Sequence, residues 1–104
     1  MTKYSIDISN LAERDIWDTV SYIQEVLFQP ESAKRIYRSI KEQVSSLATM
    51  PDRYALIGEE PYTAKGVRKV RVENYLIFYI VNEKAKTVSI LRVLYNRREW
   101  HNLI

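Results

Sequence analysis

The sequence contains no cysteine, and only one histidine, two glycines and three prolines in 104 residues. Without cysteine, disulfide bonds cannot stabilise the fold, and thiolate nucleophiles and thiolate metal sites are excluded. A single histidine argues against a histidine-based metal cluster, so no metal or other cofactor is expected. Because glycine and proline are scarce, we expect few loops and a single domain over residues 1–104.

The chain also lacks an apolar run of the roughly 20 residues that a membrane span needs. Its N-terminus enters an alternating stretch, KYSIDIS, without the basic and apolar segments of a signal peptide. We therefore expect a cytoplasmic protein that does not use a membrane as partner. The net charge is only +3, from 16 Lys and Arg against 13 Asp and Glu. This excess suits an anionic partner without requiring one.

What the N-terminal half does contain is a strand period followed by two helix periods. Residues 4–8 alternate apolar and polar side chains, which predicts a half-buried strand. Asn10 followed by Glu13 resembles a capping box, so we expect a first helix from there to Pro30. Its expected apolar stripe is Ile16, Val20, Ile23 and Leu27.

A second helix is expected to begin at Pro30 and to run antiparallel to the first, because the connection between them is short. One face of this helix carries the apolar residues Ala33, Ile36, Ile40, Val44 and Leu47, and the opposite face carries the cations Lys34, Arg38 and Lys41.

The C-terminal half predicts an ordered loop over residues 50–65 and then three strands, separated by turns at residues 73–74 and 82–86. Residues 97–104 suggest a short final helix. The expected fold class is therefore α+β, with the order β-α-α-β-β-β, an antiparallel sheet, a helical hairpin packed on one face and a short C-terminal helix.

The expected turns determine which side chains share a face of the sheet. A two-residue turn at 73–74 pairs Arg71 with Leu76, and a turn centred on Lys84 places Arg92 opposite Leu76. These residues would form one row of a basic face, with Lys69 opposite Phe78 in the next row. The other face would hold the apolar set Val70, Val72, Ile77, Leu91 and Val93, which is suited to packing beneath the helices.

Two arginines in one row of a sheet repel each other unless an anion lies between them. Phosphate is such an anion, and a guanidinium group binds it through two parallel hydrogen bonds. Tyr95, Trp100 and His101 would add rings able to stack on unpaired bases. Cations beside stacking rings favour RNA over a DNA duplex.

Structural roles explain the same residues equally well. Arg71 and Arg92 could pair with carboxylates such as Glu73, Trp100 could anchor the last segment to the sheet, and His101 could be an ordinary surface residue. The face would also be unusually apolar for one left in water, so we expect the terminal helix or a partner to cover part of it. Its apolar residues are Leu76, Phe78, Ile80 and Leu94.

The order of these elements and two stretches, Lys69 to Tyr79 and Arg92 to Trp100, resemble the RelE/ParE superfamily of toxins from bacterial type II toxin-antitoxin modules. The resemblance covers essentially the whole chain. It implies a growth-inhibiting toxin that a cognate antitoxin protein neutralises, in a complex that binds operator DNA.

Members of the superfamily act on different targets. RelE-like toxins cleave messenger RNA in the ribosomal A site without a metal, whereas ParE-like toxins poison DNA gyrase. Our first hypothesis is an endoribonuclease that cuts ribosome-bound mRNA, the second is a gyrase poison, and the third is an inactive module that only joins its antitoxin for autoregulation. The ending RVLYNRREW resembles ParE more closely, since the C-terminal catalytic tyrosine of RelE has no clean equivalent.

The first hypothesis assigns roles to particular residues. A metal-free ribonuclease needs a group to take the 2′-hydroxyl proton and cations for the charge that develops on the phosphoryl oxygens. His101 is the only side chain that titrates near neutrality when unperturbed. The resemblance implies Arg71 and, with a shift of one residue, Arg97 as catalytic cations, and Tyr95 and His101 are the candidates to replace the RelE tyrosine. The residues expected to bind RNA are Lys69, Arg92, Arg98, Arg68 and Trp100.

Overall fold

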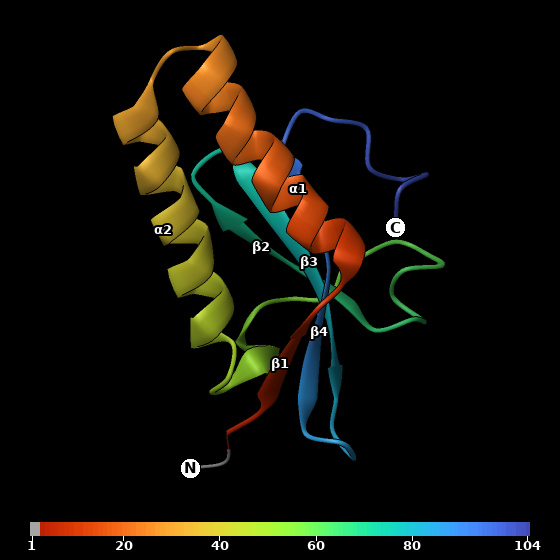
Figure 1. The fold of residues 1–104 in the computed structure, drawn as a ribbon. Coiled ribbons are helices and arrows are strands. Elements are labelled where there is room, and N and C mark those ends of the chain that lie inside the picture. Colours follow the sequence, from red (N-terminus) through yellow and green to blue (C-terminus); the bar gives the residue numbers. More distant parts are fainter. Residues whose placement is uncertain (1–2) are drawn as a thin grey trace.

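A four-stranded sheet carries two antiparallel helices on one face in the computed structural model, which describes residues 3–104 (Figure 1). The elements are β1 (Ser5–Ile8), α1 (Asn10–Ser21), the π-helical turn η1 (Tyr22–Val26), α2 (Pro30–Ser46), the 3-10 turn η2 (Pro51–Arg53), β2 (Val67–Val72), β3 (Tyr75–Asn82) and β4 (Thr87–Tyr95). The α+β class and the helical hairpin are thus as expected.

The sheet is mixed rather than antiparallel, which corrects the expected topology. Its strand order is β1-β4-β3-β2, and β1 runs parallel to β4 while the other pairs are antiparallel. The helical hairpin returns the chain to the start of β1, where the Tyr4 N–H donates to the Ala48 carbonyl at 2.7 Å. The three antiparallel strands that follow therefore begin and end in the direction of β1, so β4 runs parallel to it. The strand β1 then takes the edge of β4 that β3 leaves open.

Both helices begin at residues suited to their first turns. Ser9, not Asn10, caps α1, and its side chain accepts a hydrogen bond from the Ala12 N–H at 3.0 Å. Pro30 occupies the first turn of α2, where its missing N–H has no cost. Between the helices, the π-helical turn shifts the apolar stripe, so Leu27 is 45% exposed instead of buried as expected.

The helix-side core fills the space between the helices and the sheet. Its strand residues include Ile77 and Tyr79, both completely buried. The Tyr79 hydroxyl donates to the Pro51 carbonyl at 2.7 Å and so attaches η2 to this core. The predicted stripe of the second helix is confirmed, because Ala33, Ile36, Ile40, Val44 and Leu47 are all buried.

A β-bulge in β4 changes which residues share the opposite face. The β2–β3 register is as predicted, with Arg71 opposite Leu76 and Lys69 opposite Phe78. In the next ladder, Phe78 pairs with Arg92 and Tyr79 pairs with Ile90, which leaves one extra residue in β4.

Two face assignments are therefore wrong. Arg92 lies in the row of Lys69, not in the row of Arg71. Leu91 packs on the face away from the helices, whereas Ile90 belongs to the helix-side core. The cause is local, since an extra residue in a strand with a side-chain period of two exchanges the faces on one side of the bulge.

The face away from the helices is covered by a second set of residues, the tail-side cluster. Its buried members are Ile57, Tyr62, Val67, Phe78 and Leu94, and its half-buried members are Leu76, Ile80, Leu91, Trp100, Leu103 and Ile104. The loop before β2 and the last residues of the chain supply the cover and lie next to each other (Figure 1). The expectation that this face is covered is confirmed.

The predicted helix over 97–104 does not form; this segment consists of turns and irregular chain. Two of its carbonyl groups accept hydrogen bonds from other elements, His101 from the Tyr62 hydroxyl and Leu103 from Arg92. Eight residues are also too few for a helix to be stable without packing that favours it. The segment instead follows the sheet surface and packs its apolar side chains there.

Candidate functional site

Arg92 is held in an ion pair at the edge of β4. Its Nε and Nη2 atoms lie 2.7 and 2.8 Å from the two carboxylate oxygens of Asp15 on α1, and its Nη1 donates to the Leu103 carbonyl at 3.3 Å. Only 13% of the Arg92 side chain and 9% of the Asp15 side chain are exposed. Hydrogen bonding to Asp15 raises the pKa of Arg92. The guanidinium is thus permanently charged and already paired inside the protein.

Asp15 is a central residue that the sequence reasoning missed. Its carboxylate also accepts the Val93 N–H at 3.0 Å. Because β1 ends at Ile8, opposite Ile90, this part of the β4 edge has no strand partner, and Asp15 takes that place. A signal was present in the sequence: Asp15 stands next to Ile16 on the buried stripe of α1, where a carboxylate needs a partner.

Arg71 lies at the β2–β3 turn and is exposed. Its Nε donates to the Glu73 carbonyl at 2.7 Å and its Nη2 to the Asn74 side chain at 3.4 Å. The Glu73 carboxylate pairs with Arg35 on α2. Arg71 therefore stabilises the turn, and two of its guanidinium nitrogens already have partners.

Arg68 and Lys69 are neighbours in the sequence but point to opposite faces of β2. Arg68 donates to the Tyr54 carbonyl at 2.6 Å and to the Asp52 carbonyl at 3.3 Å, so it holds the chain around η2. Lys69 is on the other face, with its Nζ 5.7 Å from the centre of the Trp100 ring. Of these two cations, only Lys69 lies beside the aromatic residues of the C-terminal segment.

Trp100 anchors the C-terminal segment to the sheet. Its ring centre lies 5.2 Å from that of Phe78 and 5.3 Å from that of Tyr62. The His101 ring stacks on it at 4.0 Å with an interplanar angle of 16°. Lys69, Trp100 and His101 are therefore one group of predicted site residues that the fold brings together.

His101 is held between two carboxylates. Its Nε2 lies 3.0 Å from Glu59, and its Nδ1 bonds Glu99, whose carboxylate also accepts the His101 backbone N–H at 2.9 Å. The hydrogen bonds to Glu99 and then to Glu59 raise the pKa of His101 above its usual value. Both ring nitrogens are thus occupied by carboxylates of the protein, so neither is free to accept a proton from a substrate.

Tyr95, Arg97 and Arg98 form a second group at the carboxyl end of β4. The Tyr95 ring meets the Tyr75 ring edge-on at 5.7 Å, and the chain turns there, with the Arg98 N–H bonded to the Tyr95 carbonyl. Both arginines are exposed, and neither has an ion-pair partner within residues 3–104. The predicted site residues thus occupy several environments instead of converging on one hollow.

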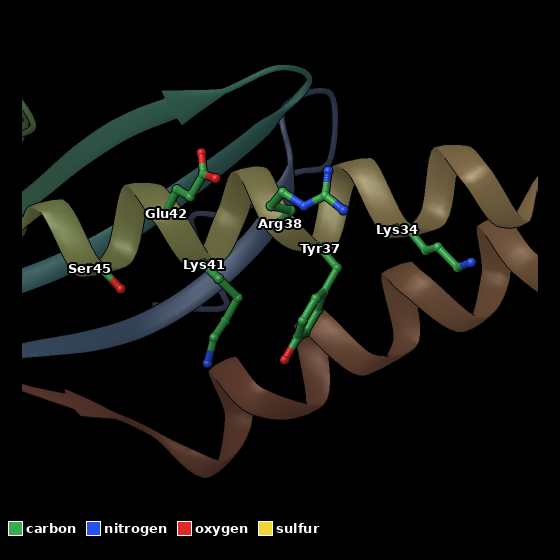
Figure 2. Close-up of a pocket in the computed structure, with 6 residues that line it drawn as sticks. All are labelled: Lys34, Tyr37, Arg38, Lys41, Glu42 and Ser45. Atoms are coloured by element: carbon green, nitrogen blue, oxygen red, sulfur yellow. The ribbon is translucent and has the colours of Figure 1, made fainter.

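The helices carry a further surface, which we call the hairpin groove. It is a hollow of about 430 Å³ lined mainly by apolar side chains, with 69% of Trp17 exposed. An adjoining hollow of about 540 Å³ on α2 is bordered by Lys34, Arg38 and Lys41. Figure 2 shows Tyr37 and Lys41 pointing from α2 toward α1, where they join the two hollows. The groove lining is Ile8, Glu13, Ile16, Trp17, Val20, Tyr37 and Lys41.

The described part of the chain offers neither a metal site nor a membrane-spanning helix. Within residues 3–104, no three His, Asp or Glu side chains lie together as a metal site would require. In the same range, every helix is too short or too polar to cross a membrane.

Several solved structures from toxin-antitoxin systems share this fold. The chain is 26% identical to a chain of the chromosomal ParDE toxin-antitoxin system of Pseudomonas aeruginosa, with a TM-score of 0.72 over 91% of this chain and 98% of that one. It is similar to a chain of the RelBE2 complex of Mycobacterium tuberculosis, at 23% identity and a TM-score of 0.67, over 89% and 98% of the two chains. The archaeal RelE–RelB complex of Pyrococcus horikoshii gives 23% identity and a TM-score of 0.62, over 95% and 100%.

No curated protein matches the chain significantly. The family described as the ParE toxin of the type II toxin-antitoxin system parDE matches residues 6–100. This match includes both helices, all four strands except the first residue of β1, and the RVLYNRREW ending. The resemblance to the RelE/ParE superfamily is thereby confirmed, and the chain belongs to the ParE toxin family of type II toxin-antitoxin systems.

Proposed function

We propose that this ParE-family toxin arrests growth by inhibiting DNA gyrase, without cutting RNA. The observation that carries the proposal is the placement of the cations: Arg92 is paired with Asp15, and His101 is held between Glu59 and Glu99. Carboxylates beside the only histidine repel a phosphate instead of attracting it.

The chemistry of RNA cleavage would also be hindered at His101. A general base must accept the 2′-hydroxyl proton, so it needs a free nitrogen within hydrogen-bond reach of that hydroxyl. Both ring nitrogens of His101 are already bonded to carboxylates, Nδ1 to Glu99 and Nε2 to Glu59. This favours a toxin that acts by binding a protein over one that acts by proton transfer.

Cleavage of ribosome-bound mRNA remains the second candidate, because one observation favours it. Lys69, Trp100 and His101 are in contact and offer a cation, a stacking surface and a titratable ring on one side of the sheet. In this alternative, a nucleotide would displace the glutamates from His101, while Arg71, Tyr95, Arg97 and Arg98 would act from neighbouring positions.

We further propose that the cognate antitoxin binds the hairpin groove as an acidic amphipathic helix. The solved relatives include the ParDE system and RelB–RelE complexes, which are toxins with their antitoxins. The apolar floor around Trp17 and Tyr37 suits an apolar helix stripe, and Lys34, Arg38 and Lys41 suit flanking carboxylates. The resulting complex would then bind operator DNA through the antitoxin.

One experiment separates the two activities. The toxin is induced in cells, RNA ends on ribosomes are mapped, and purified protein is assayed for inhibition of gyrase supercoiling. We expect inhibited supercoiling and unchanged RNA ends, and we expect His101→Gln to retain toxicity because inhibition of gyrase by binding needs no proton transfer at this residue. New ribosome-associated RNA ends that disappear in His101→Gln, with normal supercoiling, would favour the second candidate. An absence of growth arrest would favour an inactive module.

A further inference from the structure

The helical hairpin ends in an exposed apolar tip formed by residues 22–28. Tyr22, Val26, Leu27 and Phe28 are 54%, 56%, 45% and 82% exposed, respectively. Large apolar side chains gathered in this way on a small protein usually mark a surface that binds another molecule. The helix-side core does not explain them, because Ile23 is the only buried residue of the π-helical turn η1.

Backbone hydrogen bonds and Pro30 fix the conformation of the tip in the absence of a partner. The Leu27 N–H bonds the Tyr22 carbonyl at 3.1 Å, the Gln29 N–H bonds the Ile23 carbonyl at 3.0 Å, and α2 starts with Pro30 directly afterwards. Phe28 has a φ of 55°, in the left-handed region that a bulky residue rarely adopts. Such strain together with a π-helical turn is common at functional sites. A preformed anchor also loses little conformational entropy on binding.

A third hollow, the tip groove, lies between the tip and the sheet. It has a volume of about 510 Å³ and is lined by α1 and η1 on one side and by Tyr75 and Tyr95 on the other. Arg97 and Arg98 follow Tyr95 after a single residue, Asn96, and both are exposed. Tyrosine and arginine are the residues that most often dominate the binding energy of protein interfaces. The full lining is Asp18, Thr19, Tyr22, Ile23, Leu27, Tyr75 and Tyr95.

The composition of the tip favours a protein over a nucleic acid. No Lys or Arg occurs between Arg14 and Lys34, so the tip itself offers no cation to a phosphate backbone. Its protruding Phe28 needs a pocket, which a folded protein has and an antitoxin helix in the hairpin groove does not. Arg97 and Arg98 favour an acidic rim around that pocket.

We propose that the tip is the surface with which the toxin grips its target protein: Phe28 enters an apolar pocket of the target, and Arg97 and Arg98 face an acidic rim. The inference rests on the proposed function in taking gyrase as that target. It assigns target binding to one end of the molecule and antitoxin binding to the hairpin groove on a different face of α1. The two partners do not share Phe28. The antitoxin would therefore prevent target binding by steric overlap or by a conformational change, and not by covering the same residue.

The test compares two substitutions at matched positions. Phe28 and Met50 are both exposed apolar residues in the left-handed region, with φ values of 55° and 49°. Asparagine tolerates this region well, so Phe28→Asn and Met50→Asn should both fold. Each variant is assayed for gyrase inhibition, growth arrest, binding to the cognate antitoxin, and oligomeric state by light scattering.

We expect Phe28→Asn to lose at least about 10-fold in gyrase inhibition and in growth arrest, as for an interface anchor. Met50→Asn should behave as the wild type, and both should keep antitoxin affinity within about 3-fold. Unchanged inhibition by Phe28→Asn would overturn the proposal. Loss of antitoxin binding, or dissociation of an oligomer, would assign the tip to the antitoxin or to a second copy and would equally overturn it.

Failure of the proposed function would give a different result. A wild-type toxin that arrests growth without inhibiting gyrase contradicts gyrase as target, but Phe28→Asn should still abolish growth arrest if the tip binds another target protein. A Phe28→Asn variant that remains fully toxic in that case overturns the tip proposal as well. A wild-type chain without toxicity overturns both.

Discussion

The two faces of the sheet are covered in different ways. On one face, two helices satisfy most of their backbone hydrogen bonds internally and bury a continuous stripe from Ala33 to Leu47. On the other face, the loop before β2 and the C-terminal segment depend on single side chains: Tyr62 holds the carbonyl of His101, and Thr63 holds that of Ile57 at 2.5 Å. The loop and the C-terminal segment should therefore open locally at a lower free energy than the two helices.

Asp15 links the two faces, so removing it should give the largest effect. Asp15→Ala leaves Arg92 charged without its carboxylate and the Val93 N–H without an acceptor. We expect a loss of about 3–5 kcal/mol in the free energy of unfolding, measured by urea denaturation. Asp18→Ala on the exposed face of α1 is the control, with an expected change below about 0.5 kcal/mol. Equal effects of the two substitutions would contradict the structural role of this ion pair.

Trp100→Ala should affect the tail-side cluster alone. Trp100 is half-buried, so we expect a loss of about 2 kcal/mol, less than for a fully buried tryptophan. Trypsin should then cleave after Arg97 and Arg98 under conditions in which the helices stay protected from amide hydrogen exchange. Ile40→Ala is the comparison in the helix-side core and should lower protection everywhere. If Trp100→Ala also exposes the helices, the two covers do not open independently.

The smallest expected effect is a pH dependence of the tail. The pKa of His101 is raised above its ordinary value of 6.5. The stabilisation from its positive charge is therefore fully present below pH 6.5 and is lost as pH rises through the higher pKa of the folded state. The pKa of Glu99 is lowered by the His101 N–H and then by the ring. Its contribution is therefore present above the ordinary value of 4.5 and lost as pH falls.

The tail should accordingly be held most firmly between about pH 4.5 and 6.5. The Trp100 indole resonance in NMR spectra should report this, with a transition above pH 6.5 that is missing in His101→Gln. A transition of the same midpoint in both proteins would show that another group is responsible.

The parts of the fold that were predicted correctly depend on short-range patterns. A turn of two residues at Glu73 and Asn74 fixes the β2–β3 register, and the stripe of the second helix follows from its period alone. The bulge in β4 has no comparable signal, because Ile90 and Leu91 are adjacent apolar residues and the sequence does not show which of them faces the helices. The absent C-terminal helix depends on Tyr62 and Arg92, which are distant in the sequence.

The sequence predicted which residue types lie near the candidate site, but not how their side chains are arranged in space. The sequence indicated that arginines and rings gather near the C-terminus, and Trp100 and His101 do stack. It could not indicate that Asp15, 77 positions away, neutralises Arg92. Nor could it indicate that Leu27 and Phe28 are exposed. Both residues follow the π-helical turn η1, and such a turn has no simple sequence period that would predict it.

The carboxylate of Asp15 also has a consequence for how this chain can recruit β-strands. Together with Ser9, whose N–H bonds the Ile90 carbonyl and whose hydroxyl bonds the Leu91 carbonyl, it occupies backbone groups that an incoming strand would need. That stretch of β4 is therefore closed to edge-to-edge aggregation. Any polypeptide that extends this sheet must add to the outer side of β1 or β2.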